Sequence, residues 1–179
     1  DRLKAKKQKT KGEGHMKSKK VAFMGLSIGL AMILSFVESQ IPALVAIPGI
    51  KVGLPNLVIV FMLYRIGAKE TVTVSLIRIL LVSILFGNLQ SMTFSIAGAV
   101  LSLLGMIILK KTNWFSCITV SIVGGILHNV GQIIAACIWT QTAEIAYYLP
   151  VLLISGIVAG TLIGLVSGIV VQKSQKWKI

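Results

Sequence analysis

Apolar stretches long enough to cross a membrane dominate this chain, and its charged residues fall almost entirely between them. A helix needs about 20 predominantly apolar residues to span the hydrocarbon core of a bilayer. The sequence divides into six such pieces, at residues 20–40, 54–67, 70–87, 90–109, 115–139 and 147–171. Apolar residues make up 55% of the chain, above the share in soluble domains. We therefore predict an all-α membrane protein, with six transmembrane helices forming one domain over residues 16–179.

Residues 1–15 differ in character from the rest. This run is rich in lysine and lacks apolar periodicity, which is typical of an expression-vector remnant with Met16 as the native start. Without its six basic residues of eighteen and its two acids of five, twelve basic and three acidic residues remain. They form short clusters between apolar stretches, not a stripe on a soluble domain. The high net charge therefore indicates that the partner of this chain is the lipid bilayer. It does not indicate that the chain binds nucleic acid.

The placement of these charges predicts the orientation, because cytoplasmic loops carry an excess of Lys and Arg. Six spans from a cytoplasmic start put ten of the twelve basic residues inside: Lys17, Lys19, Lys20, Arg65, Lys69, Lys110, Lys111, Lys173, Lys176 and Lys178. Only Lys51 lies outside, with Glu38 and Glu144 near the outer face. Both termini are therefore expected on the cytoplasmic side. The outer connection at 41–53 contains Pro42, Pro48 and Gly49, which favours a structured cap or re-entrant segment.

Small residues recur every three or four positions in three of the spans. They are Gly25, Ser27, Gly29 and Ala31 in the first, Ser91, Ser95, Gly98, Ser102 and Gly105 in the fourth, and Gly156, Gly160, Gly164 and Gly168 in the sixth. Such spacing lets two helix backbones approach closely. Each stripe predicts either packing within this protein or a docking face for another membrane subunit.

Polar side chains gather on one face of the fifth span. His128, Asn129 and Gln132 follow Ser121 and Gly125 along this face. Side chains of this kind would be costly against lipid, so the face is expected to point into the bundle or a cavity. Two interpretations stay open, a hydrogen-bond network between helices and a ligand pocket.

Arg78 lies inside the third span, where a charged Arg costs about 2.5–3.5 kcal/mol on insertion scales. With only three acids after residue 15, partner carboxylates are scarce. Arg78, Lys51 and His128 are therefore candidates for binding an anionic ligand. The alternative is that Arg78 is held by an internal partner.

Several motifs of enzymes are absent. Residues 16–179 contain no Asp, so clustered carboxylates for magnesium are missing. The chain has no G-x-x-x-x-G-K-[ST] loop for ATP hydrolysis and no metal-ligand spacing of Cys and His. We predict no catalytic residues, no metal site and no cofactor, and therefore no enzyme.

Five segments in order carry a family resemblance: IPGIKVGLPN at 47–56, SLIR to LFG at 75–87, SIAG at 95–98, LHNVGQ at 127–132 and YYLP at 147–150. Together they resemble the Gx transporter family, also labelled heptaprenyl diphosphate synthase component I. That family is similar to the substrate-binding S components of energy-coupling factor transporters.

The resemblance implies a six-helix S-component fold in the bacterial plasma membrane, with a ligand site near the outer face. It implies uptake of a vitamin-like molecule, anionic or flavin-like, with a membrane T subunit and two cytoplasmic ATPases as partners. Docking on the T subunit would use Gly25, Ser27, Gly29 and Ala31, where the family usually has alanines. Ligand binding would use Lys51, Asn56, Arg78, His128, Asn129 and Gln132. The alternative is a non-catalytic subunit in isoprenoid or quinone synthesis, or in extracellular electron transfer.

Overall fold

The computed structural model describes residues 2–41 and 52–176, with side chains from Ser18 onward. These residues form six α-helices and one short 3-10 helix: α1 (Arg2–Gln40), α2 (Leu54–Arg65), α3 (Ala68–Phe86), α4 (Leu89–Thr112), α5 (Cys117–Thr140), η1 (Glu144–Tyr148) and α6 (Leu149–Ser174). The predicted spans match these helices to within three residues at every end except the start of α1, which extends back into the segment expected to be a remnant. The all-α, six-helix prediction is confirmed.

Among the described residues, four stretches of helix are long and apolar enough to cross a membrane: Ser18–Gln40, Leu89–Thr112, Cys117–Thr140 and Glu144–Ser174. The 12 residues of α2 reach about 18 Å, less than the hydrocarbon core. In α3, the 19 residues include Lys69, Glu70 and Arg78. The chain is therefore a membrane-embedded helical bundle in which α2 and α3 are the helices least like a membrane span.

Local sequence explains where several helices begin. Gly67 adopts φ 141° between α2 and α3, a conformation that favours glycine and allows the chain to reverse abruptly. Asn88 and Ser91 cap the start of α4 reciprocally, with the amide of Ser91 donating to Asn88 Oδ1 at 2.8 Å. Ser116 Oγ accepts from the Thr119 amide at 3.2 Å at the start of α5.

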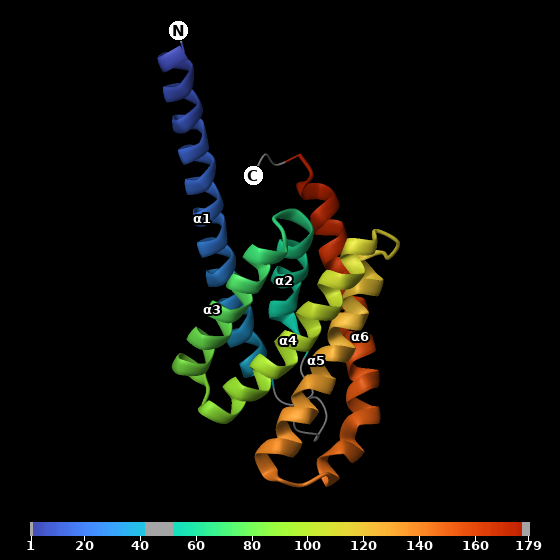
Figure 1. Cartoon of the computed structure of the whole chain (residues 1–179). Coiled ribbons are helices and arrows are strands. Elements are labelled where there is room, and N and C mark those ends of the chain that lie inside the picture. The colour runs from blue at the N-terminus through green and yellow to red at the C-terminus, as the bar shows by residue number, and fades with distance from the viewer. Residues whose placement is uncertain (1, 42–51, 177–179) are drawn as a thin grey trace.

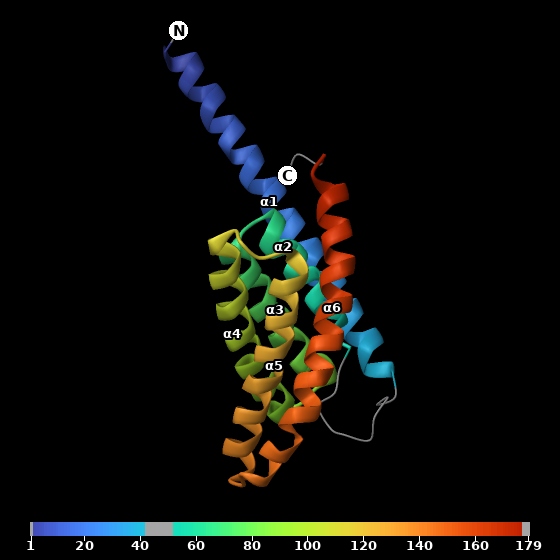
Figure 2. The same ribbon diagram turned by 90° about the vertical axis from the view of Figure 1, so that its right-hand side faces the viewer.

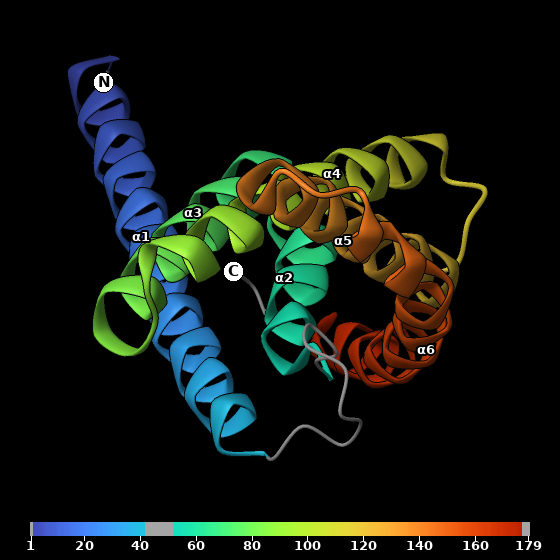
Figure 3. The same cartoon turned by 90° about the horizontal axis from the view of Figure 1, so that it is seen from below.

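The helices form two groups. In one group α1 packs on α2 and α3, and in the other α5 lies between α4 and α6, which it contacts extensively. The groups are joined where α2 meets α6 and α3 meets α4. Viewed along the bundle, α4, α5 and α6 form an arc on one side, while α1 and α3 lie together on the other (Figure 3).

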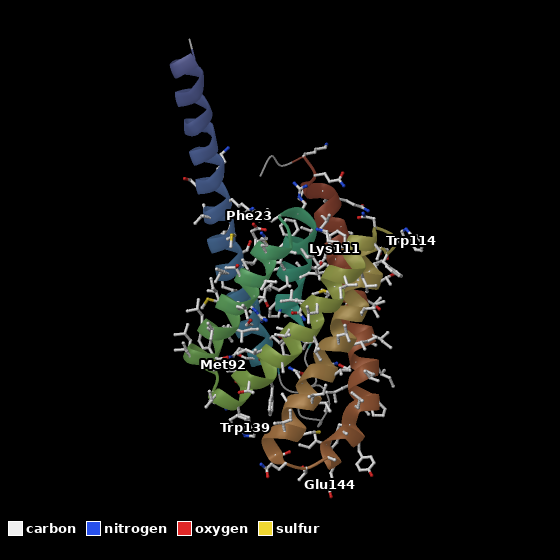
Figure 4. The ribbon with its side chains drawn as sticks, viewed as in Figure 1. Phe23, Met92, Lys111, Trp114, Trp139 and Glu144 are labelled. Atoms are coloured by element: carbon white, nitrogen blue, oxygen red, sulfur yellow. The ribbon has the colours of Figure 1, made fainter. Side chains whose placement is uncertain are left out.

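Both termini lie at the same end of the bundle, together with the α2–α3 and α4–α5 connections (Figures 1 and 2). Glu144 and Trp139 lie at the opposite end from Lys111 and Trp114 (Figure 4). This arrangement agrees with the expected even number of crossings. Which end faces the cytoplasm stays a prediction.

The short helix α2 is the centre of the core. Its Val58, Ile59, Val60, Met62 and Leu63 are at most 3% exposed. Side chains from α1, α3, α4, α5 and α6 pack against them: Ala31, Val74, Leu103, Met106, Val120 and Ile163. A helix that is apolar on every side is buried on every side. Its central position therefore explains how so short a segment can be this hydrophobic.

Candidate functional site

The polar centre of the first group of helices is Arg78. It lies on α3, and its Nη1 donates to Ser35 Oγ of α1 at 3.3 Å. Its Nε is buried and has no hydrogen-bond partner among the described residues. Ser35 itself donates to the carbonyl of Ala31 at 2.8 Å. The guanidinium is thus held by one neutral hydroxyl and keeps a buried donor unsatisfied.

Glu38 is the acid whose charge acts on Arg78, one turn beyond Ser35 on α1. Its Oε1 accepts a hydrogen bond from the backbone amide of Gly53, just before α2. Within the described part of the chain, Glu38 and Arg78 do not form an ion pair; Lys20 and Glu70 do. Glu38 therefore connects the C-terminal end of α1 to the start of α2 beside Arg78, without a direct salt bridge.

Ser35 and Glu38 were not among the residues predicted for the site. The sequence does contain a pattern that could have identified them: Ser27, Ala31 and Ser35 recur at steps of four on the first span. In the structure all three are buried. Glu38 continues the same face three residues later. Small and polar residues that recur on one helix face would have indicated that this face points into the bundle.

The polar face of the fifth span lies in the second group of helices. Asn129 Nδ2 donates to the carbonyl of Leu152 on α6 at 2.5 Å. The His128 ring lies against α4, because its Cε1 and Nδ1 are each 2.9 Å from where a Cβ on Gly98 would stand. Gln132 is half-buried on the same helix. For Asn129 at least, the structure favours the hydrogen-bond network over a free ligand group.

The predicted binding residues therefore fall into separate places. Arg78 faces α1, whereas His128 and Asn129 face α4 and α6. Asn56 is half-buried in the first turn of α2, with Nδ2 3.4 Å from where a Cβ on Gly53 would stand. Lys51 lies outside the described residues, as do Pro42, Pro48 and Gly49 of the predicted outer cap.

The four predicted docking residues of α1 divide between two faces. Gly25 and Gly29 are exposed, and a Cβ on either would meet no atom within 4 Å. Ser27 and Ala31 are 6% and 0% exposed, and Ser27 Oγ lies 3.2 Å from Met62 Sδ of α2. Only the two glycines are placed where a second protein could approach.

The glycine stripe of α6 is an internal packing surface. A Cβ added at Gly160 would stand 2.6 Å from Ile122 Cα, and one at Gly164 would stand 2.7 Å from Ile118 Cα. A Cβ at Gly156 would lie 3.0 Å from the carbonyl group of Gly125. Helix α5 therefore occupies this stripe along most of its length, which leaves no room there for another subunit.

No metal centre is found among the described residues, where no three His, Cys, Asp or Glu side chains gather. A guanidinium such as that of Arg78 has the chemistry to bind a carboxylate or a phosphate.

Comparison with known proteins gives one match. No curated protein and no solved structure is significantly similar to this chain. The family described as heptaprenyl diphosphate synthase component I matches residues 26–170, which include helices α2 to α5 whole, most of α6 and most of the membrane-spanning part of α1. The chain belongs to the heptaprenyl diphosphate synthase component I family.

Proposed function

We propose that this protein is the substrate-capture subunit of an ATP-driven uptake system, similar to the S components of energy-coupling factor transporters. It would bind a small anionic or flavin-like molecule from outside. The observation that carries the proposal is Arg78, a half-buried cation between α1 and α3 with one hydroxyl partner and a buried, unsatisfied Nε.

The energetic reason is the cost of this residue. An Arg at mid-span costs about 2.5–3.5 kcal/mol on insertion scales. A buried donor without a partner adds about 1–3 kcal/mol. A single hydrogen bond to Ser35 offsets little of this, and Glu38 is engaged with the Gly53 amide. An anionic group of a ligand would satisfy the guanidinium in a two-pronged geometry that matches carboxylates and phosphates.

Transport would require partners, because the sequence contains no ATP-binding loop. The exposed Gly25 and Gly29 offer α1 as the docking face for a membrane T subunit carrying two cytoplasmic ATPases. A helix face with glycines four residues apart, and no neighbour within 4 Å of either, permits close approach of a second helix.

Ligand binding tests the role of Arg78. Molecules that copurify with the protein are first identified by native mass spectrometry. Riboflavin, flavin mononucleotide, biotin and isopentenyl diphosphate are then compared by thermal melting in detergent. For whichever ligand binds, Arg78→Gln is expected to lower affinity about 10- to 150-fold, equivalent to about 1.5–3 kcal/mol.

The matched control is Arg65→Gln, since Arg65 Nη2 donates to the carbonyl of Ser174 at 2.8 Å at the end of the bundle near the termini. This variant should lose stability and keep its affinity. If Arg78→Gln behaved in the same way, Arg78 would be a structural residue and the proposed ligand site would be wrong.

Docking is tested separately. Gly29→Leu should weaken copurification with a T subunit and leave ligand affinity unchanged, because a large side chain would hold the two helices apart. Leu104→Phe, on the exposed face of α4, serves as the control and should have no effect. Loss of ligand binding with the partner retained would contradict this role for α1.

The name of the family favours a second candidate, a membrane subunit that assists isoprenoid or quinone synthesis. Copurification distinguishes the two. Recovery of a soluble prenyl diphosphate synthase, without a T subunit or ATPases, would favour the synthase subunit. An arrangement of T-subunit and ATPase genes beside this gene would favour uptake.

A further inference from the structure

A groove of about 330 Å³ lies between α1 and the start of α3, at the end of the bundle that carries both termini. It is separate from the Arg78 site, which lies further along both helices. Six residues line it: Lys20, Val21, Met24, Lys69, Glu70 and Thr73. The lining combines apolar side chains of α1 with charged side chains of both helices.

The charge of the groove is positive. Lys20 Nζ and Glu70 Oε1 form an ion pair at 2.6 Å, which fixes the position of the Lys20 ammonium between the two helices. Lys69 is exposed and makes no ion pair within the part of the chain that the structure describes. Two lysines against one glutamate leave a net charge of +1 on the lining, and Lys19 adjoins it on α1. An anion therefore matches the groove, and its strongest free partner is Lys69.

An apolar track leads away from the groove along α3. Ile77, Leu80 and Ile84 are 37%, 45% and 77% exposed. They follow Thr73 at helical spacing, so they lie on one face of the helix below the groove. Val21, at the groove itself, is 68% exposed. A ligand with a charged head and a long hydrocarbon tail could use both parts at once.

We propose that this groove binds the phosphate of an anionic phospholipid, such as phosphatidylglycerol, from the surrounding leaflet. Lys69 and Lys20 contact the phosphate, and one acyl chain lies along Ile77, Leu80 and Ile84. Basic pockets between transmembrane helices at the cytoplasmic level suit acidic head groups. The orientation predicted from the Lys and Arg distribution places this end of the bundle at that level. The inference does not depend on the transport function.

The test uses the full chain in detergent. Native mass spectrometry compares how many molecules of phosphatidylglycerol and phosphatidylcholine remain bound after equal loading, and thermal melting compares the stabilisation by each lipid. Phosphatidylglycerol is expected to be retained preferentially and to stabilise more. Lys69→Gln should reduce its retention about fivefold, since one basic residue near the surface is worth about that much.

Two further variants separate the groove from general charge. Lys111→Gln removes another exposed lysine at the same end but outside the groove, and should leave retention unchanged. Thr73→Trp fills the groove without changing its charge, and should reduce retention as Lys69→Gln does. Gel filtration and circular dichroism check that each variant is folded.

Three outcomes would overturn the proposal. Equal losses in Lys69→Gln and Lys111→Gln would mean diffuse attraction to the bilayer. Equal retention of the two lipids would mean that charge does not select the ligand. Competition by inorganic phosphate at concentrations similar to the lipid would mean that the groove binds soluble anions.

Discussion

The two groups of helices are held together by different means. Between α4, α5 and α6 the contacts run from backbone to backbone through glycine: a Cβ on Gly131 would stand 2.5 Å from the Ala97 oxygen, and one on Gly125 would stand 2.5 Å from the Gly156 oxygen. Between α1, α2 and α3 the contacts run through side chains. Arg78 reaches Ser35, Lys20 pairs with Glu70, and the glycines of α1 face outward.

This difference shows that one sequence pattern serves two purposes. Small residues at four-residue spacing occur in α1 and in α6. In α6 they admit the backbone of α5, whereas in α1 the glycine positions face open space. Without a hydrophobic force between helices in lipid, close packing of this kind supplies much of the association. We therefore call the closely packed α4–α5–α6 group the scaffold, whereas α1 has an open face at its two glycines.

The largest expected effect comes from breaking the scaffold. Gly131→Leu would push a side chain against the carbonyl of Ala97 and the Cα of Gly98, which stand 2.5 and 2.8 Å from a Cβ at that position. Neither backbone atom can move aside by rotating, so we expect a loss of roughly 3 kcal/mol or more. Thermal melting in detergent measures it.

Gly29→Leu is the matched variant in the other group. On α1, a Cβ at Gly29 would meet no atom within 4 Å, so stability should change by less than about 0.5 kcal/mol. Equal losses in the two variants would contradict the distinction between scaffold and open face.

A smaller loss of stability is expected from the contact of Lys110, which joins α4 of the scaffold to α2. Lys110 Nζ donates to the carbonyl of Leu63, and it lies 5.4 Å from the centre of the Tyr64 ring. Lys110→Met removes the charge and the hydrogen bond while keeping the stem, and should cost about 1.5–3 kcal/mol. Lys111→Met, at an exposed neighbour, should cost almost nothing. Similar melting temperatures for the two variants would show that the Lys110 contacts contribute little to stability.

The smallest effect is expected inside the scaffold at Asn129. Its hydrogen bond to the Leu152 carbonyl joins α5 to α6, and such bonds in membrane proteins contribute about 0.6 kcal/mol, rarely above about 1.7. Asn129→Leu should therefore lower stability slightly. Its ligand affinity should not change, because Asn129 already has an internal partner. A loss of ligand affinity without a loss of stability would show that Asn129 binds the ligand, as the sequence analysis predicts.

Most of the fold could be predicted from the pattern of apolar stretches and charges. Among the described helices, every first and last residue except the start of α1 lies within three residues of its predicted position. The site could be predicted less well. Arg78 was identified by its cost in the membrane, but its contact with Ser35 and the nearness of Glu38 depend on how α1 is rotated against α3. Helical spacing on one chain segment does not fix that rotation.

The sequence by itself determined that this protein lies in a membrane, that it crosses it as a helical bundle, and that its basic residues gather toward one end. Those properties follow from transfer free energies, which each segment carries wherever its neighbours lie. Only the tertiary structure decided that Gly160 and Gly164 are covered while Gly25 and Gly29 are open, and that Arg78 and Asn129 face different helices. Packing partners decide these matters, because a small residue permits a close contact but does not choose which helix makes it.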